Sequence, residues 1–203
     1  TLQALSFTPD VIHCHDWHTA MLPYLLNHER SGFFEQTKTV FTIHNAAFQG
    51  VHSLEKIPFL RHHPHIFSQV HGGYINMLQT GIECASKVTT VSPNYADELL
   101  TDLGSHGLHE RLVKRKADLS GILNGCDYSQ WNPATDAYLP ENYSVDNLQP
   151  KRVCKTTLQT RSGLPENAGV PLIGMVCRLT EQKGFGYILP ILDDLVQHNL
   201  QIV

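Results

Sequence analysis

The amino-acid sequence predicts an α/β fold in which a parallel sheet carries helices on its faces. Short apolar runs typical of buried strands alternate along the chain with segments of helical periodicity. Several of these runs end directly in polar residues, such as His44-Asn45 and Asn124-Gly125. Ligands of open α/β folds bind at the carboxyl edge of the sheet, so these polar residues are candidates for a binding site.

Each element is predicted from its own local pattern. The predicted strands cover residues 10–15, 38–44, 87–91, 119–123 and 171–177. The predicted helices cover residues 18–30, 75–84, 93–103, 108–116, 150–162 and 187–198. Ser92 is a good N-cap with Pro93 at the first helical position, and Gly163 followed by Pro165 ends another helix.

The composition excludes several classes of protein. A hydrophobic content of 41% and a charged content of 17% over 203 residues are ordinary for a globular protein with a sizeable core. The net charge of −4 argues against a nucleic-acid partner. No apolar run approaches the roughly 20 residues that span a bilayer. We therefore expect neither nucleic acid nor membrane among the partners.

The cysteines show neither a disulfide framework nor a metal-binding pattern. They form no CxxC pair and their number is odd. Most lie in apolar stretches, so we expect buried, reduced thiols in a reducing compartment. The five are Cys14, Cys84, Cys126, Cys154 and Cys177.

A change in composition predicts two domains. Residues 165–170 contain Pro, Asn and Gly ahead of a new apolar strand, which indicates an interdomain linker. Residues 1–164 then belong to a first domain, and residues 171–203 begin a second. The chain opens without an initiator Met and ends inside an apolar run, so we expect it to be an internal part of a longer protein.

Two cations, Arg178 and Lys183, follow the predicted strand at 171–177 and precede Gly184. Arginine offers a planar fork to phosphate oxygens, and lysine adds a compact charge. Gly184 lets the backbone approach an anion, and a following helix turns its positive end toward it. The pattern predicts phosphate binding; the alternative is a pair of solvated loop cations.

Residues 13–18 (HCHDWH) raise the question of a metal site. On a strand, His13 and His15 face one side and Cys14 the other. The order of ligands differs from HxHxDH, because Asp16 directly follows His15 and a tryptophan precedes the last histidine. We expect no metal here. Asp16 is instead expected to be the turn and N-cap residue, with its carboxylate at the sheet edge.

Two further strand ends carry polar pairs. His44-Asn45 can hydrogen-bond sugar hydroxyl groups, although a structural histidine is an equal alternative. Asn124-Gly125 taken alone is a turn signal.

Together these motifs resemble the bacterial glycogen synthases and plant starch synthases. The matching strings are DVIHCHDWHTAMLPYLL, TVFTIHNAAFQG, VTTVSPNYADEL, LSGILNGCDYSQWNPATD and CRLTEQKG. They occur in the family's order over nearly the whole chain. The resemblance implies the GT-B fold, with two Rossmann-like domains facing across a cleft. It also implies retaining transfer of glucose from ADP-glucose to the non-reducing end of an α-1,4-glucan, with no metal or cofactor.

Roles for individual residues follow from the resemblance. Arg178 and Lys183 match the family's cations on the donor diphosphate, where they would neutralise charge as ADP leaves. His44 matches the family's active-site histidine near the transferred glucose, and Asp16 matches the acidic residue that lines the same pocket.

Three other residues are implied to bind substrate. Asn124 matches the Asn of the family's LNG motif at the cleft. Asn45 and Trp17 are expected to form a second layer of substrate contacts, behind the residues named above. The chain offers no protein nucleophile, which suits a front-face mechanism.

The sequence also departs from the family. The N-terminal Lys-x-Gly-Gly loop and the later glutamate motif are absent, and Gln79 and His109 stand where relatives often have a Lys and an acidic residue. We therefore do not expect the chain alone to catalyse the reaction. The alternatives are another retaining GT-B transferase, of the sucrose or trehalose-phosphate type, and a non-catalytic glucan-binding fragment. The resemblance implies a cytoplasmic protein, or a plastid one if the source is a plant, and leaves ADP- against UDP-glucose open.

Overall fold

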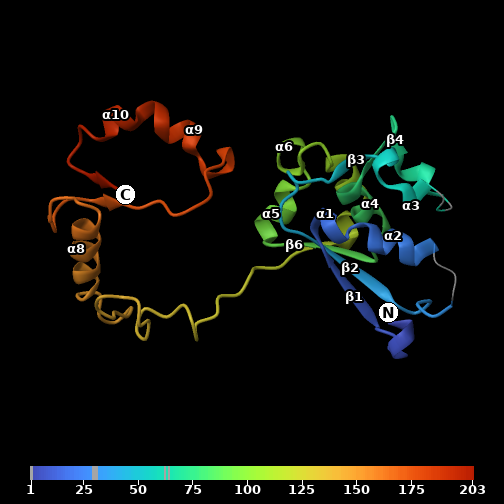
Figure 1. Ribbon diagram of the computed structural model, residues 1–203, viewed down its shortest axis with the longest axis horizontal. Coiled ribbons are helices and arrows are strands. Elements are labelled where there is room, and N and C mark those ends of the chain that lie inside the picture. Colours follow the sequence, from blue (N-terminus) through green and yellow to red (C-terminus); the bar gives the residue numbers. More distant parts are fainter. Residues whose placement is uncertain (1, 29–31, 62, 64) are drawn as a thin grey trace. The chain divides into compact units, whose positions relative to one another are not determined.

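The computed structural model describes residues 2–28, 32–61, 63 and 65–203. It divides into two compact units, Thr1–Gly125 and Cys126–Val203 (Figure 1). Each unit is described on its own below.

The first unit is built on a four-stranded parallel sheet, as the sequence predicts. The strand order is β1 (Val11–His15), β2 (Lys38–Ile43), β6 (Lys87–Thr90) and β7 (Leu119–Gly121). In the register of β1 and β2, His13 lies beside Val40 and His15 beside Thr42. All four strands therefore end at one edge, where His44 directly follows β2.

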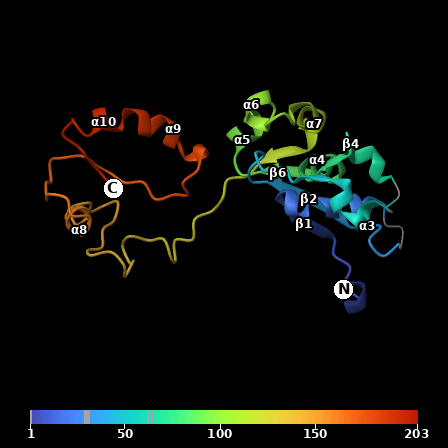
Figure 2. The same ribbon diagram turned by 45° about the horizontal axis from the view of Figure 1, so that its top comes forward.

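Helices pack against this sheet and enclose the core of the unit (Figure 2). They are α1 (Asp16–Thr19), α2 (Met21–His28), α4 (Met77–Cys84), α5 (Pro93–Glu98), α6 (Asp102–Ser105) and α7 (His109–Lys114). Tyr24, Phe41 and Ile82 are fully buried among them. A Cβ at Gly81 would come within 2.7 Å of the Phe41 ring, so α4 lies close to β2 because residue 81 has no side chain.

Helix boundaries differ from the predicted ones where local caps intervene. Ser92 caps α5 as predicted, with its Oγ accepting from the Tyr95 amide at 2.9 Å. The helix ends at Glu98 rather than at residue 103, because Thr101 caps a new helix by accepting from the Gly104 amide. The predicted helix at 18–30 is divided into α1 and α2, and residues 29 and 30 lie outside the described residues.

A small antiparallel sheet follows the first two strands. Its order is β3 (Val51–Ser53), β5 (Tyr74–Asn76) and β4 (Val70–His71), and α3 (Pro58–Arg61) lies in the same region. The helix predicted from residue 75 begins at Met77, because residues 74–76 pair with β3 and the Asn76 side chain caps α4.

The second unit contains α8 (Lys151–Arg161), α9 (Phe185–Ile188), α10 (Leu192–Leu195) and the parallel pair β8 (Leu172–Ile173) and β9 (Gln201–Ile202). Residues 126–150 hold no helix or strand. The strand predicted at 171–177 is only two residues long, because β9, the strand with which it pairs, is equally short. The predicted helix at 187–198 is divided, with a 3-10 turn at Leu189–Ile191 that contains Pro190.

The predicted linker, residues 165–170, lies within the second unit. The Lys155 Nζ donates to the carbonyl oxygens of Ala168 and Val170, which ties this segment to α8. The domain boundary at this segment stays a prediction. Within the described part of the chain, every helix is too short or too polar to span a bilayer.

The expectation of buried thiols holds only in part. All five cysteines are free, and Cys14 is buried in the core. Cys126 and Cys177, however, are exposed, because the segments around them form no continuous strand with a covering layer.

Candidate active site

The carboxyl ends of β1 and β2 bring Asp16 and His44 together. Asp16 follows β1 directly and has a left-handed backbone, with φ of 54°. Its Oδ1 accepts from the backbone N–H of His44 at 2.8 Å. The predicted sheet-edge position is confirmed. The predicted N-cap role is wrong, because the carboxylate reaches across to the next strand rather than to an amide of α1.

The ring of His44 meets a second imidazole. His15 Nδ1 lies 3.0 Å from His44 Nε2, and the ring centroids are 5.2 Å apart. Both side chains are exposed at the edge of the sheet. No hydrogen bond from a described residue reaches the other ring nitrogen of His44, so Nδ1 is available to a ligand.

His13 completes a row of three histidines. Its ring packs on that of His15, with centroids 4.2 Å apart. Its Nε2 hydrogen-bonds Thr42 Oγ1 at 2.6 Å, and Thr42 in turn bonds Thr89 Oγ1 at 2.6 Å. Partial burial, and then the neighbouring His15 and His44, lower the pKa of His13 below its ordinary value. These surroundings therefore favour the neutral form of the His13 ring.

The Trp17 ring lies against several neighbours. It stacks on His18 with centroids 4.0 Å apart, its centroid is 5.6 Å from that of the His52 ring, and it lies close to Gly50. A Cβ at Gly50 would lie 2.4 Å from Trp17 Cε3, and Gly50 has φ of 60°. The half-buried indole therefore lies next to Asp16 in a fixed position.

The loop after His44 is rigidly bonded. Asn45 Oδ1 accepts from the Ala47 amide at 3.0 Å, and the Ala46 amide donates to the Tyr95 hydroxyl at 3.0 Å. Gln49 Nε2 donates to the Ala46 carbonyl at 3.2 Å. Asn45 therefore shapes the loop that presents His44, as well as lying beside the site.

Asn124 is not brought into this cluster by any hydrogen bond among the described residues. It is exposed in the irregular segment that follows β7. Its predicted role in binding substrate stays a prediction.

Arg178 and Lys183 belong to the second unit, and both are exposed. Lys183 ends a 3-10 turn, Glu181–Lys183, and Gly184 follows with φ of 83°. The side chains of both cations are without an ion pair to any described residue. They are free to meet an anionic ligand.

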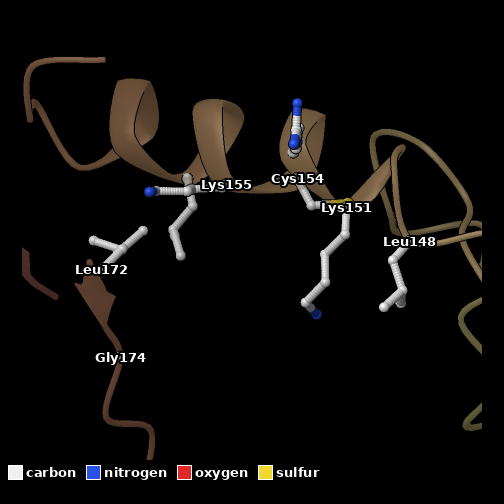
Figure 3. A pocket seen from close by; sticks show the side chains of 8 residues that line it. Leu148, Lys151, Cys154, Lys155, Leu172 and Gly174 are labelled. Atoms are coloured by element: carbon white, nitrogen blue, oxygen red, sulfur yellow. The ribbon is translucent and has the colours of Figure 1, made fainter. Parts of the chain in front are cut away.

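The second unit also has a cavity of about 510 Å³ between α8 and β8 (Figure 3). Its lining includes Leu148, Leu158, Leu172, Lys151, Arg152 and Lys155. Lys151 Nζ donates to the Tyr143 hydroxyl at 2.8 Å, and Lys155 holds the carbonyl of Val170. Because two of its three cations serve the fold and no predicted site residue lines it, we do not include it in the candidate site.

The contact of His15 with His44 was not predicted, because in the sequence His15 is a candidate only for metal binding. Its spacing of two from His13 and its place at the end of a strand do indicate the sheet edge. Across the described residues, no group of three or more His, Cys, Asp or Glu side chains is arranged to hold a metal ion. The absence of a metal stays a prediction.

Comparisons with known proteins agree on one family. Residues 1–114 match the family described as "Starch synthase catalytic domain". The chain is 50% identical to a glycogen synthase of Aeromonas salmonicida (strain A449), covering 99% of this chain and 42% of that protein. It is 51% identical to a glycogen synthase of Vibrio cholerae serotype O1 (strain M66-2), covering 100% of this chain and 43% of the relative.

A solved structure is similar over the same length. The catalytic domain of starch synthase IV from Arabidopsis thaliana, bound to ADP and acarbose, matches with a TM-score of 0.85 and 32% identity. The match covers 99% of this chain and 43% of that one. The chain thus spans less than half the length of these relatives.

Proposed function

Because this chain belongs to the starch synthase catalytic domain family, we propose that the protein containing it is a glycosyltransferase that extends an α-1,4-glucan. The donor is ADP-glucose, and glucose passes to the non-reducing end with retention of configuration. The proposal includes the GT-B arrangement of two domains and no cofactor. A cytoplasmic location stays a prediction.

The observation that carries this proposal is the pairing of Asp16 with His44 at the carboxyl edge of the sheet. The 2.8 Å bond from the His44 amide to Asp16 Oδ1 fixes the backbone of the histidine. The imidazole is exposed, and its Nδ1 has no hydrogen bond to a described residue. An imidazole nitrogen can donate to or accept from a sugar hydroxyl group, so this edge suits the transferred glucose.

The charge on the donor needs a partner as well. We assign Arg178 and Lys183 to the diphosphate, since both are exposed and without ion pairs among the described residues. Fixed cations that meet the growing negative charge of the leaving ADP stabilise the transition state. The helix that directly follows Gly184, α9, has only four residues, so the proposal depends on the two side chains and not on a helix dipole.

The ligands of the similar plant structure support the same classes of partner. That structure holds ADP and acarbose. We propose ADP-glucose as the donor and an α-1,4-glucan as the acceptor for the present protein.

The test is a donor panel on the full-length protein that contains this chain. With glycogen as acceptor, we expect labelled glucose to be incorporated from ADP-glucose, and we expect the product to be digested by enzymes specific for α-1,4 linkages. His44→Ala should abolish most transfer, and His71→Ala, at an exposed histidine of β4, should not. Transfer to an acceptor other than a glucan would support a different GT-B transferase. Glucan binding without transfer from any donor would support a binding protein.

A further inference from the structure

The side chain of His15 contacts the ring of His44 through a single hydrogen bond of 3.0 Å. The contact crosses from the last residue of β1 to the residue after β2. We propose that His15 is a positioning residue that fixes the orientation and tautomer of His44. The proposal rests on the proposed function of His44 at the glucose site.

The chemistry of two neutral imidazoles leaves only two arrangements at this contact. Either His15 Nδ1 donates to His44 Nε2, or His44 Nε2 donates to His15 Nδ1. A neutral imidazole carries one proton, so the choice at Nε2 of His44 decides whether its Nδ1 is an acceptor or a donor. His15 therefore sets which kind of hydrogen bond His44 offers a sugar hydroxyl.

The same contact limits the charge at this edge of the sheet. If both rings were protonated, two N–H groups would face each other across 3.0 Å and the hydrogen bond would be lost. The pair holds at most one positive charge while the contact lasts.

His15 is itself held firmly enough to serve as a support. Its backbone N–H donates to Thr19 Oγ1 at 2.6 Å, and its carbonyl accepts from the same hydroxyl at 2.8 Å. The His13 ring packs against the His15 ring and is anchored to Thr42. A mobile side chain could not select a tautomer, whereas this one is fixed at backbone and ring.

Three other titratable groups lie near the pair of His15 and His44. His13 on β1 packs against the His15 ring, with centroids 4.2 Å apart. Asp16 on α1 accepts a hydrogen bond from the backbone N–H of His44. The Tyr95 hydroxyl on α5 accepts one from the backbone N–H of Ala46, two residues further on. Neither Asp16 nor Tyr95 hydrogen-bonds the His44 ring, so His15 is the described side chain that sets its tautomer.

The experiment compares two substitutions at His15 in the full-length protein. Asn places a donor or acceptor near the position of Nδ1, so His15→Asn should keep the contact. His15→Phe keeps a ring but removes the hydrogen bond. His71→Phe, at an exposed histidine of β4, is the matched control.

The first readout is independent of activity. Long-range ¹⁵N NMR of the imidazole groups reports the tautomer of His44 directly. We expect one dominant tautomer in the wild type, in His15→Asn and in His71→Phe, and a mixture of both tautomers in His15→Phe. An unchanged His44 ring spectrum in His15→Phe would overturn the proposal.

The second readout is turnover with ADP-glucose and glycogen. Because a misplaced group near the reacting atoms costs roughly 10–100-fold in rate, His15→Phe should lower kcat by about that factor. His15→Asn should restore kcat to within about threefold of the wild type, a rescue that a merely structural role does not require. Equal losses of kcat in both variants, or no loss of kcat in His15→Phe, would contradict the positioning role of His15. If the wild type transfers no glucose at all, the proposed function fails, and the NMR comparison still decides the contact.

Discussion

At the scale of single residues, Gly50 shows how the backbone positions Trp17. Its φ of 60° and the 2.4 Å approach of a Cβ to the indole both exclude a side chain. Gly50→Ala should lower the free energy of unfolding by roughly 2–5 kcal/mol, which combines left-handed strain with overpacking. Urea denaturation measures this loss.

The matched control for this prediction is Gly72→Ala. Gly72 has φ of 58°, but beyond its two chain neighbours no atom of a described residue lies within 4 Å of its would-be Cβ. We expect only the backbone cost, about 1–2 kcal/mol. If the two variants lose the same stability, the contact with Trp17 has no energetic role.

His13 gives the site a defined response to pH. Its folded-state pKa lies below the ordinary value of 6.5, so below about that pH the unfolded chain takes up a proton that the folded chain does not. Stability is therefore lost as the pH falls through 6.5 toward the lower folded-state value. His13→Gln keeps a donor for Thr42 and cannot titrate, so its unfolding free energy should fall less between pH 7.5 and 5.

Chemical denaturation at a series of pH values measures this difference. His71→Gln serves as the control, because it removes an exposed histidine away from the cluster. Its slope should match that of the wild type. A wild-type slope in His13→Gln as well would show that His13 has no part in the acid response.

Arg178 and Lys183 should affect rate and not folding. Removing a charge-assisted contact to a developing phosphate charge costs roughly 10²–10³ in rate, whereas an exposed cation contributes under about 1 kcal/mol to stability. In the full-length enzyme, Lys183→Ala should lower kcat at least about tenfold with little change in Tm. Arg178→Lys should also lower kcat, because lysine cannot form the bidentate hydrogen bonds of a guanidinium group. Lys116→Ala, another exposed cation, should leave kcat unchanged.

The assay for this prediction pairs initial rates with thermal melting. Near-normal turnover in both site variants would refute the phosphate role. A loss of activity that only accompanies unfolding would refute it equally.

At the scale of elements, Arg115 shows how α4 ends inside the protein. The carbonyl groups of its last turn lack helical partners. Arg115 Nη1 donates to the carbonyls of Ile82 and Glu83 at 2.9 and 3.0 Å, and Asn27 Nδ2 donates to that of Cys84 at 2.8 Å. The Arg115 guanidinium, which follows α7, thus caps the carboxyl end of α4, because its planar set of N–H groups reaches several carbonyl acceptors at once.

Arg115→Lys should therefore cost about 1–3 kcal/mol of unfolding free energy, since lysine cannot reach these carbonyls together. The control is Arg111→Lys, whose single ion pair with Glu83 at 3.1 Å is partly exposed and worth under about 1 kcal/mol. Guanidinium denaturation of both variants measures the difference. A smaller loss at Arg115 than at Arg111 would contradict this account of the helix end.

The strands and caps of the first unit were predictable because their signals are local. Residues 11–15, 38–43 and 87–90 are apolar or β-branched enough to be recognised as buried strands, and Ser92-Pro93 marks a helix start by itself. The second unit was predicted less well. Its strand at residue 172 depends on a partner almost thirty residues away, and composition alone does not fix that pairing.

At the scale of the whole molecule, the attachment of residues 165–170 to α8 can be tested. Lys155 Nζ donates to the carbonyls of Ala168 and Val170. Limited proteolysis of the full-length protein should cut residues 165–170 more readily than β8, as an interdomain linker requires. Lys155→Met should raise the cleavage rate there further, because it frees both carbonyls.

Arg152→Met is the control, since Arg152 lies on the same helix and is exposed. It should leave the rate at 165–170 unchanged. Equal resistance of residues 165–170 and β8 would count against a linker at this place. Equal rates in the two variants would show that Lys155 does not hold the segment.

The parallel α/β architecture of the first unit, and the edge at which its polar residues gather, were predictable from local composition. Buried strands, caps and strand ends are each encoded within a few residues. Which of these residues touch depends on how the strands pair. Asp16 meets the His44 amide, and His15 meets the His44 ring, only because the parallel register sets His15 beside Thr42. A register is a property of two strands together, so neither strand's sequence alone could show that His15 supports His44.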